Sequence, residues 1–572
     1  MFSKSRIFPL IPFFILSFTF KSDLTLAAYP APTWSRGSGM AATPHIEATN
    51  AANEVLLSGG NALDAALAAV FALAVVEQYH SGLGGGEFII YRDNKTGNSV
   101  ALDAREIAPK EAASDMFIDR DTGKPFEDKS WRGGLAVGVP GSVAGRVLVH
   151  EKYGRLSLKQ VLAPAVKLAS DGFIVDRMMA NRLNGKRDVI AEDEAASKVF
   201  FRNNEPVQRG ELLRQPNLAK TLSTIASDKG KSFYHGEQAK YIAKSCQKSG
   251  GILTEVDMSE YKPVWRNPVC FSYRNCEIIS MPPPTSGGVC LNMILKLLED
   301  FPLSYTGSGS SESLHLIASA FEIAFADRSV WLGDPDFSII PSSGMTSDKY
   351  NEKLKKKINK QHREAIDKPG DPWQYVTDGN TSHVSVIDAE GNMCSITTSV
   401  NTTFGSLVYV PELGIFLNST MDDFAKAPSE PNKFDLVAGE VNLAEPGKRP
   451  LSSMSPTLVL KDNQPYMCIG SVGGPRIITS VAQIIINVVD FGMDVQAAID
   501  APRIHMQWKP DILYVEDEIA PEVLQKLRDF GWSIKRDGHW SLSQGVLFDP
   551  LKDEFFGASD SRGVGSAGAG GK

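Results

Sequence analysis

The pattern of hydrophobic residues changes near residue 381, and this change most restricts what the chain can fold into. Before it, residues 48–78 and 150–265 are mainly helical in pattern. After it, apolar and polar residues alternate with a period of two, which is typical of half-buried strands. The alternating segments are residues 384–386, 393–400, 407–410, 457–460 and 466–469. Helical patterns return near residues 475–500 and 520–530, so the C-terminal part is predicted to begin as stacked antiparallel strands with helices to follow.

The first residues have the features of a targeting segment. Two basic residues precede an apolar run over residues 7–20, and small residues stand at Ala27 and Ala28. The run is shorter than the ~20 residues that a membrane span needs. A charged start, a short apolar run and small residues fit a secretory signal peptide over residues 1–28, with a periplasmic or secreted product. An uncleaved N-terminal anchor is the alternative.

Composition excludes several classes of function. The 572 residues carry a net charge of −8, which argues against a surface that binds nucleic acid. None of the six cysteines forms a C-x-x-C pair, and the nine histidines form no H-x-x-x-H pair, so we expect no metal and no cofactor. Cys270 and Cys276 are the nearest candidates for a disulfide, but buried free thiols are favoured. The apolar stretch at residues 65–76 predicts a buried, alanine-rich helix.

Thr381 follows Asn380 in a polar, turn-prone stretch and begins the first alternating segment. If the bond between the two residues were cut, Thr381 would carry a nucleophile and a base on one residue. An α-amino group has an unperturbed pKa of ~7.7–8.0, so a usable fraction is a free base near neutral pH. That amine can accept the proton of the threonine hydroxyl as the oxygen attacks a carbonyl.

Several polar clusters accompany Thr381, and each has an ordinary structural interpretation when taken alone. A pair of aspartates is most often a turn, two serines a loop, and an arginine a surface ion pair of little energetic value. The residues concerned are Arg105, Ser399, Asn401, Thr420, Asp422, Asp423, Ser452, Ser453, Gly473 and Gly474.

Together these residues resemble the γ-glutamyltranspeptidase family. The resemblance covers nearly all of residues 40–562 and rests on the start Thr-x-His-x-Ser at 381–385 and on Leu-Ser-Ser-Met at 451–454. Further matching motifs are residues 60–66, 139–145, 326–328 and 332–337.

The resemblance implies an α+β, N-terminal-nucleophile hydrolase fold: a four-layer αββα sandwich with two stacked antiparallel sheets flanked by helices. It also implies a precursor that cuts itself between Asn380 and Thr381, giving a heterodimer of a large subunit (29–380) and a small subunit (381–572). The Gly/Ala/Ser-rich residues 563–572 are expected to be a disordered tail.

The resemblance further implies an enzyme that cleaves the γ-glutamyl amide of glutathione and related donors. Thr381 would form a γ-glutamyl ester, which passes to water or to an amino acid or peptide acceptor. The implied roles are an oxyanion hole at Gly473 and Gly474, and a hydroxyl at Ser399 that steadies the nucleophile, where the family usually has Thr.

The donor's two charges also have implied partners. The α-carboxylate would be held by Arg105, Ser452 and Ser453, and the α-amino group by Asn401, Asp423 and the residue at 420. The family commonly has Glu or Gln at that position, so Thr420 predicts altered donor recognition.

Residues 425–447 resemble a substrate-covering lid closed by Phe434, for which a mobile loop is the alternative. His383 is expected to be structural rather than a base. Two other functions stay open: a glutaryl or cephalosporin acylase of the same fold, and a secreted binding protein that is never processed.

Overall fold

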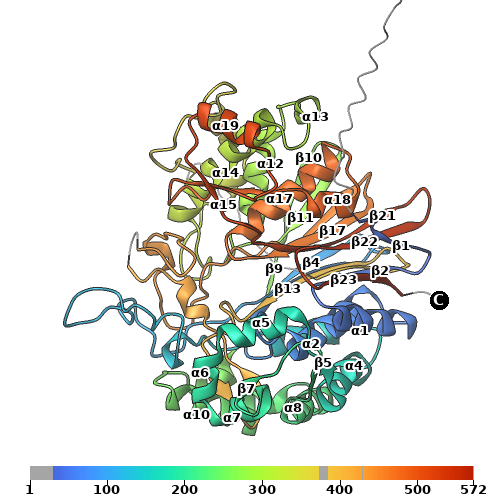
Figure 1. Cartoon of the computed structure of the whole chain (residues 1–572), viewed down its shortest axis with the longest axis vertical. Helices are drawn as coiled ribbons and strands as arrows, with labels where there is room; N and C mark the ends of the chain where they lie inside the picture. Colours follow the sequence, from blue (N-terminus) through green and yellow to red (C-terminus); the bar gives the residue numbers. More distant parts are fainter. Residues whose placement is uncertain (1–29, 373–383, 428–429, 571–572) are drawn as a thin grey trace, which may run out of the picture.

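Two antiparallel sheets lie face to face in the middle of the molecule, with helices covering the outer face of each (Figure 1). The computed structural model describes residues 30–372, 384–427 and 430–570. The first sheet has seven strands in the order β1 (Thr33–Arg36), β22 (Glu554–Ser559), β21 (Leu542–Asp549), β17 (Gln464–Val472), β16 (Thr457–Lys461), β11 (Cys276–Ser280) and β10 (Val269–Tyr273). The second has seven in the order β23 (Ser566–Ala569), β2 (Met40–Thr43), β12 (Ser385–Ile387), β13 (Met393–Ser399), β3 (Gly86–Arg92), β4 (Ser99–Ala104) and β9 (Val264–Arg266).

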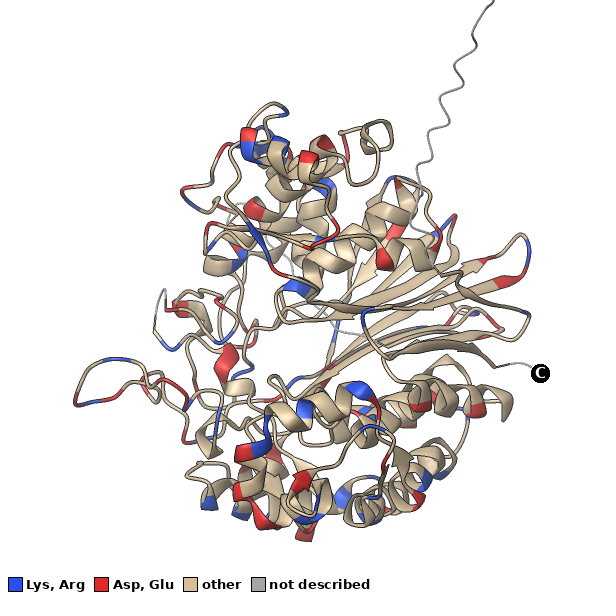
Figure 2. Cartoon of the chain, viewed as in Figure 1, with Lys and Arg blue, Asp and Glu red and all other residues tan. Residues whose placement is uncertain are grey.

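The two faces of the second sheet bury different sets of side chains. Along β3, Phe88 and Ile90 pack into the core that includes the first sheet, whereas Ile89 and Tyr91 pack into the core beneath the second layer of helices. Successive side chains of a strand point to opposite faces, so a sheet that is covered on both sides needs apolar residues at every position. Figure 2 accordingly shows few charged residues on the strands and most of them on the outer helices and loops.

One helical layer, below the sheets in Figure 1, comes mainly from the first half of the chain. It includes α1 (Ile46–Leu57), α2 (Ala62–Val76), α3 (Ser142–Tyr153), α4 (Leu158–Asp171), α5 (Arg177–Gly185), α8 (Pro216–Asp228) and α10 (Glu237–Lys248). Helix α2 begins with a capping box between Asn61 and Asp64 and is buried along its whole length, which confirms the predicted alanine-rich core helix.

The opposite layer includes α12 (Gly287–Leu298), α14 (Ser311–Trp331), α17 (Arg476–Val489), α18 (Val495–Asp500) and α19 (Pro521–Asp529). Helix α14 lacks the exposed face that is usual for a helix in an outer layer. Almost every residue from Ser311 to Ser329 is buried, because α14 lies between α12 and α19 and its polar side chains pair inside the protein.

The C-terminal residues correct another expectation. Ser566–Ala569 do not belong to a disordered tail: they form β23, whose Ser566 and Ala569 pair with Thr43 and Met40 of β2. The small residues allow this because the backbone runs close to its neighbours; a Cβ added to Gly568 would lie 2.4 Å from the side-chain nitrogen of Asn53. An edge strand of the sheet thus supplies hydrogen bonds that composition alone does not reveal.

The predicted strands after residue 384 are confirmed as β12, β13, β14 (Tyr409–Val410), β16 and β17. The interpretation of the cysteines as buried free thiols is confirmed for five of the six, whereas Cys270 is free but exposed. Cys270 and Cys276 lie on neighbouring strands, but they stand opposite Ile279 and Tyr273 rather than each other. In the described part of the chain, no helix has both the length and the apolar character needed to cross a membrane. The proposed signal peptide (1–28), Asn380, Thr381 and His383 lie outside the described residues.

Candidate active site

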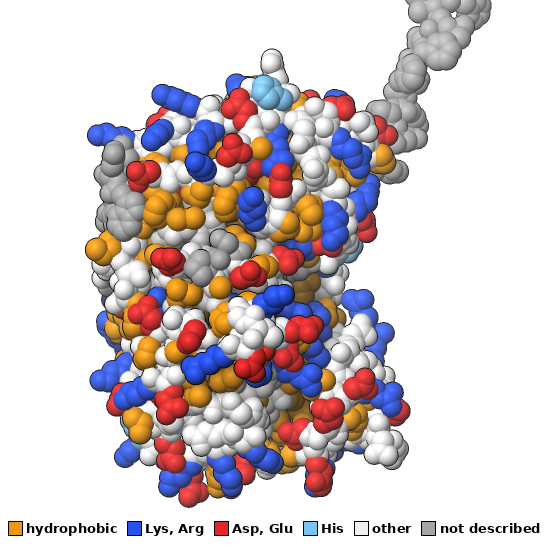
Figure 3. Space-filling view, turned by 90° about the vertical axis from the view of Figure 1, so that its left-hand side faces the viewer, with side chains coloured by type: hydrophobic (Ala, Val, Ile, Leu, Met, Phe, Trp, Pro, Cys, Tyr) orange, Lys and Arg blue, Asp and Glu red, His pale blue; other side chains and the backbone are white. Residues whose placement is uncertain are grey.

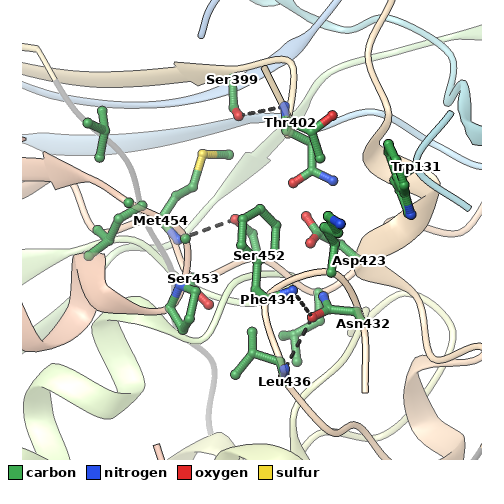
Figure 4. A pocket seen from close by; sticks show the side chains of 18 of the residues that line it. Trp131, Ser399, Thr402, Asp423, Asn432, Phe434, Leu436, Ser452, Ser453 and Met454 are labelled. Carbon is green, nitrogen blue, oxygen red and sulfur yellow. Dashed lines mark hydrogen bonds between the residues drawn. The ribbon is translucent and has the colours of Figure 1, made fainter. Parts of the chain in front are cut away.

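A pocket of about 460 Å³ opens where β4, β13 and β17 end, which is within the usual size range for small-molecule sites. All but one of the described residues with an implied site role line it. They are Arg105, Ser399, Asn401, Asp423, Phe434, Ser452, Ser453, Gly473 and Gly474. Figure 4 shows how several of these side chains gather around the cavity.

The end of β13 places Ser399 and Asn401 in the pocket wall. Asn401 has a φ of 74°, a left-handed conformation that asparagine tolerates better than most residues. Its backbone N–H donates to Ser399 Oγ at 2.9 Å, and its side-chain Nδ2 donates to the carbonyl oxygen of Ser419 at 2.8 Å. These contacts end the strand and hold the asparagine side chain in one orientation.

Gly473 and Gly474 form the turn between β17 and α17. Their φ angles are 134° and 60°, which residues with a Cβ rarely adopt. A Cβ on Gly474 would also lie 2.9 Å from the Phe434 ring, and one on Gly473 would lie 2.8 Å from Ser541 Oγ. Among the described residues, neither glycine N–H donates to a backbone carbonyl. The two amides stand at the N-terminus of a helix, where anions are stabilised.

Opposite charges meet in the same cavity. Arg105 is 1% exposed, and its Nη2 donates to Asp423 Oδ2 in a close ion pair. Burial raises the pKa of Asp423 to about 6, although the guanidinium of Arg105 opposes this shift. The aspartate is therefore ionised at neutral pH but protonates in the mildly acidic range.

The two serines belong to a loop that is fixed by a second arginine. Arg328 of α14 donates from Nε to Ser286 Oγ at 2.8 Å and from Nη2 to Ser453 Oγ at 3.0 Å. The carbonyl oxygen of Ser452 accepts from the backbone N–H of Ser286 at 2.9 Å. The sequence marked residues 326–328 only as a matching motif and gave Arg328 no role. A charged residue near the end of a largely apolar helix was the signal that could have found it.

Thr420 is the exception among these residues. It is fully buried, does not line the pocket, and donates from Oγ1 to Glu106 Oε1 at 2.7 Å. Glu106 in turn lies 3.4 Å from Arg105 Nη1, and burial raises its pKa. Thr420 is therefore hydrogen-bonded to the carboxylate behind Arg105, and its role in binding the donor stays a prediction.

Phe434 lies over the glycine turn, as expected of a lid residue. Asn432 Oδ1 accepts hydrogen bonds from the backbone N–H groups of Phe434 at 2.9 Å and Leu436 at 3.2 Å (Figure 4). Gln507 Nε2 donates to the carbonyl oxygen of Asp435 at 3.1 Å. The asparagine thus shapes the turn around the aromatic ring, and Gln507 ties that turn to the body of the protein.

Several other residues of the pocket wall have no recognisable signal in the sequence. Trp131 and the basic side chains of Arg182, Lys186 and Lys433 also line the pocket. His80 lines it too, but burial lowers its pKa to about 3, so its imidazole is neutral. Figure 3 shows the surrounding face, on which acidic, basic and hydrophobic side chains are intermixed.

Comparisons with known proteins agree with this geometry. A family model described as Gamma-glutamyltranspeptidase matches residues 48–570. The glutathione hydrolase proenzyme of Escherichia coli (strain K12) is 42% identical over 553 residues, which cover 94% of this chain and 95% of that protein. Among solved structures, cephalosporin acylase from Bacillus halodurans matches with a TM-score of 0.84 and 27% identity, covering 96% of this chain and 98% of the other.

The Helicobacter pylori γ-glutamyltranspeptidase structure has a TM-score of 0.57 and 38% identity, covering 60% of this chain and 98% of the other. These neighbours confirm the predicted N-terminal-nucleophile hydrolase fold, with its two stacked antiparallel sheets between helical layers. The family model matches most of the length of this chain, and the predicted site residues line one pocket. The chain therefore belongs to the γ-glutamyltranspeptidase family.

Proposed function

We propose that the protein is a self-processing γ-glutamyltransferase and glutathione hydrolase whose nucleophile is Thr381. The observation that carries this proposal is the pocket that holds Arg105 and Asp423 together with the amides of Gly473 and Gly474. One end of the pocket carries a positive and a negative side chain, which complement the carboxylate and the ammonium group of an amino acid. The glycine turn provides N–H donors for an oxyanion.

The donor's glutamyl end is a zwitterion, and the cavity contains a partner for each charge. The guanidinium of Arg105 suits the α-carboxylate, because it can donate two parallel hydrogen bonds. Asp423 suits the α-ammonium group, and the side chain of Asn401 lines the same pocket. Hydroxyl groups of Ser452 and Ser453 complete the carboxylate site.

The described chain resumes at Val384, beside the strand β13 that ends at Ser399 in the pocket wall. The carbonyl of Val384 accepts from the N–H of Ile396 at 2.8 Å, three residues before Ser399 on β13. Three residues of extended chain span at most about 10 Å, which limits how far Thr381 can stand from Val384. This limit on the distance supports the assignment of Thr381 as the nucleophile.

The proposed reaction passes through an ester. The Thr381 hydroxyl attacks the γ-carbonyl carbon while its proton moves to the α-amine of the same residue. The Gly473 and Gly474 amides stabilise the tetrahedral oxyanion, and loss of one such donor typically costs ~10²–10³-fold in rate. The C–N bond then breaks as the leaving amine takes the proton. Water or an acceptor amine opens the ester and releases glutamate or a γ-glutamyl product.

Processing would use the same hydroxyl on a different carbonyl. Thr381 attacks the carbonyl carbon of Asn380, the peptide bond becomes an ester, and water hydrolyses that ester. Residues 29–380 and 381–572 would then stay associated, since Arg105 comes from one part and Asp423 from the other. The N-terminal segment 1–28 would direct export to the periplasm or the medium.

An acylase that takes glutaryl donors is the second candidate, because a cephalosporin acylase shares the fold. A glutaryl group lacks the ammonium and would leave Asp423 without a positive ligand group. Release of 4-nitroaniline from γ-glutamyl-4-nitroanilide and from glutaryl-4-nitroanilide separates the two functions. We expect the higher kcat/KM with the γ-glutamyl donor; a higher value with the glutaryl donor would support the acylase.

A further inference from the structure

We propose that the outer end of the pocket is a second anion subsite, formed by Trp131, Lys186 and Lys433, which binds a carboxylate remote from the γ-glutamyl group. That carboxylate belongs either to the donor's leaving group or to the acceptor. The inference rests on the proposed function and adds a second recognition element to it.

The two lysines of the subsite lie near the aromatic ring of the third residue, Trp131. Lys433 Nζ is 4.4 Å from the centroid of the Trp131 ring, and Lys186 Nζ is 5.9 Å from the same centroid. All three line the pocket, and Figure 4 shows Trp131 at one side of it. Lys433 is exposed and Lys186 and Trp131 are half-buried, whereas Arg105 is fully buried. The basic pair therefore stands at the mouth and the arginine at the inner end.

The positive charges at the mouth have no close counter-ion in the part of the chain that the structure describes. Within residues 30–372, 384–427 and 430–570, no carboxylate lies within 4.0 Å of the ammonium group of Lys186 or Lys433. The nearby Arg132 has Glu192 only at 3.9 Å, and the exposed Glu430 is the acidic residue that shares the rim. Burial and the positive charges of Lys433 and Arg132 lower the pKa of Lys186. A bound anion would relieve this repulsion.

A buried carboxylate holds the subsite together. Asp422 is fully buried; its Oδ1 accepts from Ser130 Oγ at 2.6 Å and its Oδ2 from the backbone N–H of Lys433 at 3.0 Å. Ser130 directly precedes Trp131 in the chain. The side chain of Asp422 therefore fixes both the loop that carries Trp131 and the backbone of Lys433. Asp422 also precedes Asp423, which connects the mouth to the inner charge pair by one peptide bond.

The chemistry of the ligand follows from the two ends of the cavity. The inner end already has partners for the α-carboxylate and the α-ammonium of a γ-glutamyl group. A peptide leaving group and an amino acid or peptide acceptor each carry another carboxylate. Two ammonium groups beside an indole suit such an anion, with the ring providing an apolar surface for the atoms next to it.

The test compares two donors that differ by one carboxylate: γ-glutamyl-4-nitroanilide and γ-glutamyl-3-carboxy-4-nitroanilide, hydrolysed without acceptor. The quantity measured is the ratio of kcat/KM for the carboxylated donor to that for the plain donor. We expect Lys186→Met and Lys433→Met each to lower this ratio by about threefold to tenfold, as suits a partly solvated charge pair. Lys240→Met, at an exposed position of α10 away from the pocket, is the matched control.

A second arm identifies the source of the carboxylate. Transfer from the plain donor to glycylglycine is compared with transfer to glycylglycinamide, again as a ratio of kcat/KM. A loss of preference for glycylglycine in the lysine variants assigns the subsite to the acceptor, and a loss in the donor ratio assigns it to the leaving group. Ratios equal to those of wild type and Lys240→Met in both arms would overturn the subsite. A wild-type protein that hydrolyses neither donor would instead overturn the proposed function and, with it, this inference.

Discussion

Arg105 and Asp423 hold each other in the pocket, although each is the expected partner of a different charge on the donor. A zwitterionic donor would exchange this one ion pair for two, so that neither buried charge is left alone. A donor with a single negative charge would take Arg105 and leave Asp423 buried without a cation, which is costly. This relationship is the structural reason to favour γ-glutamyl over glutaryl donors.

Removal of the guanidinium should mainly weaken donor binding. We expect Arg105→Ala to lower kcat/KM for γ-glutamyl-4-nitroanilide by about 100-fold or more, because Asp423 and the donor carboxylate both lose a buried partner. Initial rates over a range of donor concentrations give the values. Arg209→Ala, at an exposed position, is the control. A donor KM equal to that of wild type would contradict the carboxylate role.

The pH dependence of kcat/KM should reveal the ionisation of Asp423. Because burial raises its pKa to about 6, the aspartate loses its negative charge as the pH falls through this value. Its attraction for the α-ammonium group is then lost, so kcat/KM for the donor should show an acidic limb near pH 6, separate from any limb that the Thr381 amine gives at higher pH. In Asp423→Asn this acidic limb should disappear along with most of the activity. An unchanged limb in that variant would assign the titration to another group.

The glycine turn and the lid should be sterically coupled. Gly474→Ala places a methyl group 2.9 Å from the Phe434 ring at a φ of 60°. We expect kcat to fall by about 10²–10³-fold as the oxyanion donors are displaced. Phe434→Ala in the same chain removes the clash and should recover part of that loss. If the double variant were no better than Gly474→Ala, contact with the ring would not be the cause.

Thr420 should matter for stability rather than for direct contact with the donor. Thr420→Val keeps the shape but removes the donor to buried Glu106, and we expect about 1–3 kcal/mol of lost unfolding free energy. Thermal and denaturant unfolding measure this loss, and Thr420→Ser serves as the variant that keeps the hydroxyl. A large rise in donor KM at unchanged stability would restore the original prediction of a substrate ligand.

Local pattern and motif were sufficient for much of the fold and the site. Alternation predicted β13 and β17, whose ends carry Ser399 and Gly473, and the matching motifs brought Arg105 and Asp423 to one pocket from distant parts of the chain. These features depend on residues that lie next to each other in sequence or in a known motif.

The features that the sequence did not reveal depend on contacts between distant parts of the chain. Thr420 has a side chain that could face either Glu106 or the cavity, and only the packed structure distinguishes the two. Small residues at 566–569 form a strand because β2 offers an open edge, and Trp131 reaches the pocket because Ser130 is held by Asp422. No periodicity within a segment encodes such long-range contacts.

The most direct test of the central claim is N-terminal sequencing of the smaller chain on a denaturing gel, for the wild-type protein and for Thr381→Ala. Thr381→Ser, which keeps a hydroxyl, is the matched control. The account predicts that the small chain of the wild type begins at Thr381 and that Thr381→Ala remains one inactive chain. A small chain that begins at another residue, or a Thr381→Ala protein that still divides in two, would contradict it.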